Sequence, residues 1–246
     1  MTRTLISLTL RQLLGRRRAL FLVVLALIPV LVAILYRFGS DHVDPPPVEF
    51  APDLLDTLLL AIVLPVTALI FGTAALGAEI EDGTAVYLLT KPIERWRILL
   101  VKVGVASAAT IALALPTALL TSLIILGGDD PHGISVGFGL GVVVGATAYC
   151  ALFVALSVRT SRALLIGLAY VFVWEAILPS IFDGTRWVSV RQYMLGLADL
   201  VSSAPASALE ADLGGGSAAV AAALLVAASI LVGNRLISRF EIGERL

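Results

Sequence analysis

Long apolar runs alternate with short polar stretches along almost the whole chain. Six of these runs come close to or exceed the roughly 20 residues, at 1.5 Å each, that an α-helix needs to cross the hydrocarbon of a bilayer. They cover residues 19–36, 54–76, 101–126, 134–157, 163–182 and 217–237. The pattern predicts an all-α polytopic membrane protein, with six transmembrane helices in a single domain over residues 1–246.

Two segments outside these runs also carry apolar residues at helical spacing. In residues 1–18, a polar stripe that includes Arg3, Ser7 and Arg11 faces leucine and isoleucine. This periodicity favours a helix lying at the membrane surface, and the alternative is a charged flank that only fixes topology.

The external segment 183–216 shows a second such pattern, which predicts a helix lying in or dipping into the outer interface, before the last span. Its apolar positions are Val190, Tyr193, Met194, Leu197, Leu200 and Val201.

Composition agrees with a membrane protein. Hydrophobic residues make up 59% of the chain and charged residues 14%, whereas soluble domains have about 45–50% and 25%. A net charge of −1 argues against nucleic-acid binding by bulk electrostatics. The single cysteine, Cys150, excludes an internal disulfide. Arginine outnumbers lysine 15 to 2, a bias typical of a GC-rich bacterial genome, so a bacterial plasma membrane is expected.

The basic residues predict the orientation. With the six spans above, 14 of the 17 lie on one side, and only Arg37, Arg186 and Arg191 lie on the other. Because basic residues accumulate on the cytoplasmic side, both termini are expected in the cytoplasm.

The second cytoplasmic loop, residues 79–95, has more chemistry than a connector needs. Asp82 or Thr84 can cap a short helix over residues 85–90, and Pro92 ends that helix and opens the third span. The short helix carries Tyr87 and Leu88, with acids before it and bases after it. Such a helix is suited to docking into a groove of another protein.

The run Glu79-x-Glu-x-Gly-Thr-x-x-x-Leu-x-x-x-Pro-Ile-x-Arg resembles the first intracellular loop of ABC-2-type permeases of ATP-binding cassette transporters. In that family this loop forms the coupling helix that sits on the ATPase subunit. The matching positions are Glu79, Glu81, Gly83, Thr84, Leu88, Pro92 and Arg95, and Asp82 and Tyr87 complete the candidate contact. An ordinary amphipathic loop helix is the alternative.

Catalytic motifs are not evident. A phosphate-binding P-loop needs G-x-x-x-x-G-K-[ST], but Lys91 is followed by proline and Lys102 by valine. The chain is therefore expected not to be an enzyme and to bind no cofactor or metal; ATP and Mg would be bound by a partner ATPase.

Two features inside the predicted spans are candidate sites. Glu175 lies well inside the fifth span, where a carboxylate is costly and needs a cavity or a partner. It either lines a pathway or is hydrogen-bonded near Trp174. Gly137, Gly141 and Gly145 recur every four residues, which marks close helix packing within the bundle or a subunit interface.

Together these features lead us to expect the permease subunit of an ATP-driven transporter, with export as the expected direction. The resemblance implies an ATP-binding cassette ATPase subunit and a second copy, or a related permease, as partners in the lipid bilayer. A non-transporting scaffold or accessory subunit is the alternative. A secondary transporter is less favoured, because the two halves share no matching motif.

Overall fold

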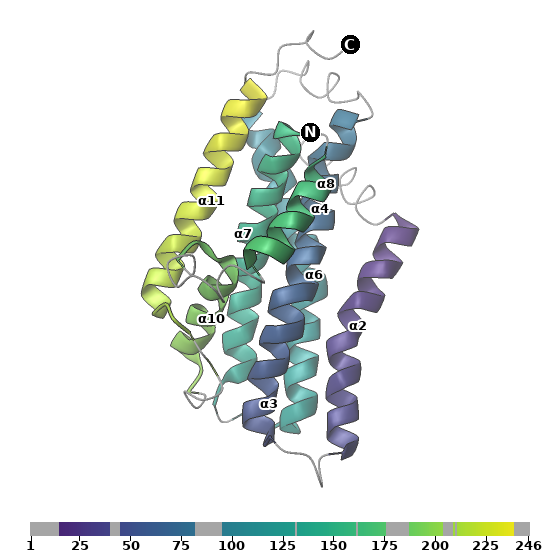
Figure 1. Cartoon of the computed structure of the whole chain (residues 1–246), viewed down its shortest axis with the longest axis vertical. Helices are drawn as coiled ribbons and strands as arrows, with labels where there is room; N and C mark the ends of the chain where they lie inside the picture. Colours follow the sequence, from purple (N-terminus) through teal and green to yellow (C-terminus); the bar gives the residue numbers. More distant parts are fainter. Residues whose placement is uncertain are drawn as a thin grey trace.

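The computed structural model describes residues 15–39, 45–81, 95–130, 132–160, 162–175, 187–203, 209 and 211–238. These residues form helices and contain no strand (Figure 1). The helices are α2 (Arg16–Gly39), α3 (Pro47–Leu54), η1 (Leu55–Val63), α4 (Leu64–Glu81), α6 (Arg95–Leu126), α7 (Ile134–Arg159), α8 (Ala163–Ala169), η2 (Tyr170–Glu175), α10 (Val190–Val201) and α11 (Gly215–Ser238). The prediction of an all-α fold is confirmed for this part of the chain.

Five helices of the described residues are long and apolar enough to cross a bilayer. They are Arg18–Gly39, Pro47–Gly77, Trp96–Leu126, Ile134–Arg159 and Gly215–Ile237, and they match five of the six predicted runs. The described part of the other predicted span, 163–182, is the shorter apolar helix Ala163–Glu175, made of α8 and η2. Residues 176–186 lie outside the described residues, so the count of six stays a prediction.

Helix α7 lies at the centre of the bundle and contacts α4, α6, α10 and α11. Within the most apolar window of each helix, 67% of α7 is buried, against 28% of α2 and 22% of α11. Figure 1 shows α2 and α11 on opposite sides of the molecule. The first and last spans are therefore peripheral, and most of their apolar surface faces outward, where lipid or another chain can cover it.

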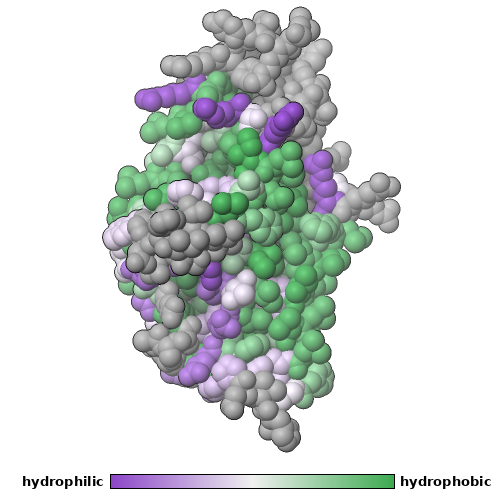
Figure 2. Space-filling model, viewed as in Figure 1, coloured by the Kyte–Doolittle hydropathy of each residue, from purple (hydrophilic) through white to green (hydrophobic). Residues whose placement is uncertain are grey.

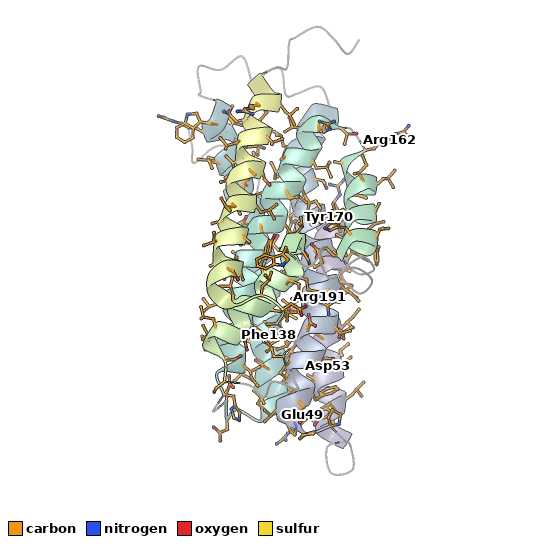
Figure 3. All side chains as sticks on the ribbon, turned by 60° about the vertical axis from the view of Figure 1, so that its left-hand side comes forward. Glu49, Asp53, Phe138, Arg162, Tyr170 and Arg191 are labelled. Atoms are coloured by element: carbon orange, nitrogen blue, oxygen red, sulfur yellow. The ribbon has the colours of Figure 1, made fainter. Side chains whose placement is uncertain are left out.

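Consecutive long helices run in alternating directions (Figure 1). The start of α2, the loop ends of α4 and α6, and the end of α11 lie together at the upper end of the view. Figure 3 places Arg162 near that end and Glu49 near the other. In Figure 2, hydrophobic residues cover much of the middle, while hydrophilic residues gather at the upper end and in a smaller group lower down.

Several threonine side chains inside the spans form hydrogen bonds within their own helix. Thr67, Thr73, Thr110 and Thr117 each donate to the backbone carbonyl four residues earlier, at 2.6–2.9 Å. An unpaired hydroxyl would be costly in hydrocarbon, and this bond removes that cost without a partner helix. Polar residues can therefore occur in these spans without marking a pathway.

The turn between α6 and α7 is built by glycine and aspartate. Gly127, Gly128 and Gly133 have φ of 71°, 87° and 67°, a region that favours glycine. The Asp130 carboxylate accepts hydrogen bonds from the backbone N–H groups of Ile134 (3.0 Å) and Ser135, which caps α7. The short connection between α6 and α7 therefore depends on glycine conformations and on the Asp130 side chain.

Of the two segments predicted to be interfacial, the structure describes a helix in the second but little of the first. Residues 1–14 lie outside the described residues, and α2 already begins at Arg16, within the predicted segment 1–18. In segment 183–216, the described helix is α10. It lies against the sides of α7 and α11, whereas a helix flat on the surface would contact only the ends of the spans.

The buried face of α10 differs from the predicted one in its second half. Leu200 and Val201 were expected on the apolar face but are 64% and 43% exposed, whereas Leu195 and Ala198 are buried. Two helices cover α10, with α7 on one side and α11 on the other. Its buried surface is therefore wider than the single stripe that periodicity predicts.

Candidate functional site

Glu175 lies at the end of η2 with a side chain that is only 3% exposed, and both of its carboxylate oxygens accept hydrogen bonds. Oε1 accepts from the Tyr170 hydroxyl and the Val190 backbone N–H, each at 3.0 Å. Oε2 accepts from the Ser189 hydroxyl at 2.6 Å and from the Arg191 backbone N–H at 3.4 Å. Three of these four donors belong to the start of α10.

This arrangement is a helix cap supplied by another helix. The first N–H groups of an α-helix have no partner within the helix, and they carry the positive end of its dipole. A carboxylate placed there pairs with the N–H groups and is stabilised in return. An acid in an otherwise apolar span is thereby explained by its contacts with α10.

A second carboxylate contacts the same turn of α10 from another span. Arg191 donates to Asp56 of η1 through Nε to Oδ1 at 2.8 Å and through Nη2 to Oδ2 at 2.6 Å. The two parallel bonds make a bidentate ion pair, the strongest geometry for these side chains. They raise the pKa of Arg191 above its usual range, so its side chain stays charged. Both side chains keep some exposure, 29% for Arg191 and 22% for Asp56.

Both carboxylates belong to π-helical segments. Asp56 is the second residue of η1 and Glu175 the last residue of η2. A π-helical turn holds one more residue than an α-helical turn, and such turns occur frequently at functional sites. Figure 3 shows Arg191 near mid-height, between Tyr170 above and Asp53 below. The first turn of α10 is thus where the second span and the Ala163–Glu175 helix meet.

The predicted glycine face of α7 lies against α10. An added Cβ at Gly137 would be 2.7 Å from the Ala198 carbonyl oxygen, and one at Gly141 would be 2.9 Å from the Met194 carbonyl oxygen. At Gly145 it would collide with the Met194 side chain. α10 of the same chain therefore covers the glycine face, and the absence of side chains on that face lets the backbones of α7 and α10 come into contact.

The candidate coupling residues lie mostly outside the described residues. Asp82, Gly83, Thr84, Tyr87, Leu88 and Pro92 are among those not described. Glu79 and Glu81 lie in the last turn of α4, and Arg95 is the first residue of α6. The end of α4 and the start of α6, which flank the loop, both lie at the upper end of the bundle in Figure 1.

Sequence reasoning singled out Glu175 and the glycines but missed Asp56 and Arg191 as a pair. The sequence places Arg191 on the outer side, off the apolar face of its helical pattern, and Asp56 at the start of the second predicted span. A usable signal existed, because an acid inside a predicted span and a basic residue in an apolar helical pattern both need partners. Nothing in the sequence, however, showed that the two residues were neighbours.

The helical bundle, its apolar surface and the buried polar contacts define a multi-pass membrane protein. The family model described as "ABC-2 family transporter protein" matches residues 10–232, and the chain belongs to this family. A comparison with curated proteins gives no match. The family supports a permease-type transport role, and the predicted resemblance of the chain to ABC-2-type permeases is confirmed.

Proposed function

We propose that the chain is the membrane-spanning permease subunit of an ATP-driven ABC transporter and works with a separate ATPase subunit. The family match over residues 10–232 carries this proposal. The chain lacks a P-loop, so ATP and Mg are bound and used on the partner. The chain itself is not an enzyme and binds no cofactor.

Residues 79–95 are the proposed contact with that ATPase. They connect α4 to α6, and α4 and α6 both contact α7. A force applied to the loop would therefore reach the centre of the bundle through two packed helices. The 14-to-3 distribution of basic residues supports a cytoplasmic position for this loop and for both termini, in a bacterial plasma membrane.

A second permease, either another copy or a related chain, would complete the pathway. The outward-facing surfaces of α2 and α11 leave room for such a partner within the membrane. Export is the proposed direction. The alternative is a membrane scaffold, in which the same loop only docks a partner and no substrate moves.

The test removes Tyr87 and Leu88, the two large side chains that the sequence places on the short helix of this loop. Tyr87→Ala combined with Leu88→Ala should weaken or abolish copurification of the ATPase, because docked helices derive most of their affinity from a few buried anchors, each costing about 2 kcal/mol or more when truncated. The measurement is ATPase recovered per permease, with ATP hydrolysis by the complex in reconstituted membranes. Leu164→Ala combined with Leu165→Ala removes exposed apolar surface outside the loop and should leave recovery unchanged.

Wild-type recovery and hydrolysis in the Tyr87/Leu88 variant would show that the loop is not the coupling element. Recovery of an ATPase whose hydrolysis is independent of the permease would instead favour the scaffold.

A further inference from the structure

The outer ends of the first three spans pack against one another. Ala33, Tyr36, Ala51, Leu54 and Ile125 make a small apolar cluster, beside which Val48 and Leu126 pack against the main core. We call α3 together with the end of α2 the outer unit. The ring of Tyr36 stacks on that of Phe50 at 4.0 Å, and the Tyr36 hydroxyl donates to the Pro45 carbonyl at 2.7 Å. α3 and the end of α2 therefore have the contacts to stay together when they move. The end of α6 stays with α7, because the Ser122 hydroxyl donates to the Ser135 hydroxyl at 2.8 Å.

The second span joins the outer unit to the main core through η1. α3, which precedes η1 in the chain, belongs to the outer unit. α4, which follows η1, packs tightly on α7, where a Cβ at Gly72 would be only 2.9 Å from the Phe153 Cβ. Bends in long helices are commonly found at π-helical turns, because an inserted residue interrupts the regular hydrogen-bond ladder. η1 is thus placed where a hinge between the tightly held α4 and the outer unit would lie.

Helix α10 is fixed at both ends and along its side. Glu175 caps its start, as described above, and its glycine contacts hold it to α7. At its end, the Ser203 N–H donates to the His132 carbonyl at 2.8 Å, and His132 Nδ1 lies 3.1 Å from the Ser203 carbonyl oxygen. α10 therefore belongs to the same rigid part as α7.

Few contacts connect α10 to η1, and the Asp56–Arg191 ion pair is the strongest of those the structure describes. The pair is partly exposed, so it is less tightly enclosed than a fully buried pair and can open with less rearrangement of its surroundings.

We propose that the outer unit swings about η1 relative to α7 and α10, and that the Asp56–Arg191 ion pair holds it in the closed position. Asp56 and Arg191 are positioning residues for this movement, and Glu175 keeps Arg191 in place by capping α10. The movement during ATP use rests on the proposed function. The closed position that the ion pair holds in the permease alone is independent of that function.

The test measures two distances with pairs of spin labels on cysteines, in a Cys150→Ser background, with the permease in lipid nanodiscs. One pair, Asp53→Cys with Asp199→Cys, joins the outer unit to α10; the other, Val136→Cys with Asp199→Cys, lies within the α7–α10 part. All three labelled residues are exposed, and none belongs to the ion pair.

Asp56→Leu should shift and broaden the Asp53–Asp199 distances and leave the Val136–Asp199 distances unchanged. Asp56→Glu keeps the charge and should restore the narrow distribution. Arg191→Gln should reproduce the effect of Asp56→Leu from the other side of the ion pair. Unchanged Asp53–Asp199 distances in both Asp56→Leu and Arg191→Gln would overturn the proposal, and so would equal broadening of both label pairs, which would indicate general loosening.

A second arm uses the permease–ATPase complex with a non-hydrolysable ATP analogue. The Asp53–Asp199 distance should shift on adding the analogue, with the Val136–Asp199 distance constant. A complex that forms but shows no shift would overturn the swing. Failure to form any complex would count against the proposed function and leave the result of the first arm standing.

Discussion

At the scale of single residues, threonines and carboxylates in the spans find their hydrogen-bond partners in different ways. Threonines such as Thr67 bond to their own helix and need no partner. Glu175 and Asp56 cannot be satisfied in this way, because carboxylates only accept hydrogen bonds and backbone carbonyls donate none. They reach across to α10 instead. A charged residue in these spans is therefore a better guide to tertiary contacts than a hydroxyl.

Glu175→Gln tests whether this residue positions α10 or lines a pathway. The amide places an NH2 group among four donors, so at least one of them loses its acceptor, at a cost of about 1–3 kcal/mol. We expect a lower thermal unfolding temperature in detergent. Asp199→Asn, an exposed acid on the same helix, is the control and should have little effect.

A pathway role predicts the reverse pattern for Glu175→Gln. The unfolding temperature would then stay at the wild-type value while transport by the complex changed.

A second residue-scale prediction concerns the glycine face. Gly141→Ala should destabilise the protein by about 1–3 kcal/mol, because the methyl group would meet the Met194 backbone oxygen and force α10 away from α7. Gly104→Ala is the matched control, since nothing lies within 4 Å of its added Cβ. The stability of both variants is measured in detergent, as the fraction of folded protein that remains on heating. Equal stability of the two variants would show that α10 can shift without cost.

At the scale of elements, hydrophobic periodicity located the helices well and their partners poorly. The run 134–157 became α7, Ile134–Arg159, because an apolar stretch of this length is stable only as a helix in lipid. The same pattern gave Leu200 to the wrong face of α10, since it detects one apolar stripe and not the second neighbour, α11. It also gave no sign of η1 or η2. A π-helical turn differs from an α-helical turn by hydrogen-bond register, which composition does not encode.

The candidate site was predictable in part for the same reason. Glu175 was conspicuous because it breaks an apolar run, and the glycines because of their spacing. The pairing of Asp56 with Arg191 joins residues 135 positions apart. Such a contact depends on how α10 folds back along α7, and local sequence carries no record of that path.

At the scale of the whole molecule, polar residues gather toward the two ends of the bundle and apolar residues cover much of the surface between them (Figure 2). The start of α2, the loop ends of α4 and α6, and the ends of α7 and α11 lie at the same end of the bundle (Figure 1), and Arg18, Arg97, Arg159 and Arg235 stand in these helix ends. Because all elements of the proposed coupling contact meet at one end, the orientation of the molecule decides whether an ATPase can reach them.

Single cysteines in a Cys150→Ser background test that orientation. Gly128→Cys and Ser203→Cys should react with a membrane-impermeant thiol reagent added to intact cells. Ala85→Cys and Gly243→Cys should react only after the cells are permeabilised, because the excess of basic residues retains their side in the cytoplasm. The measurement is labelled permease before and after permeabilisation. Labelling of Ala85→Cys from outside would contradict both the orientation and the coupling loop.

The cap on α10 also bears on the order in which the chain enters the membrane during translation. The most apolar window of Arg18–Gly39 has a mean hydropathy of 3.0, so this first helix can partition into lipid as soon as it leaves the ribosome. The Ala163–Glu175 helix ends in an acid. A charged residue opposes insertion by about 2.5–3.5 kcal/mol at the centre of a membrane helix, and an acid away from the centre still lowers the tendency of the helix to insert. Three of the four groups that bond to Glu175 are made 14–16 residues later in the chain. A nascent chain that stops before Ser189 is therefore expected to hold this helix poorly in the bilayer, and the helix integrates stably only once α10 has been synthesised.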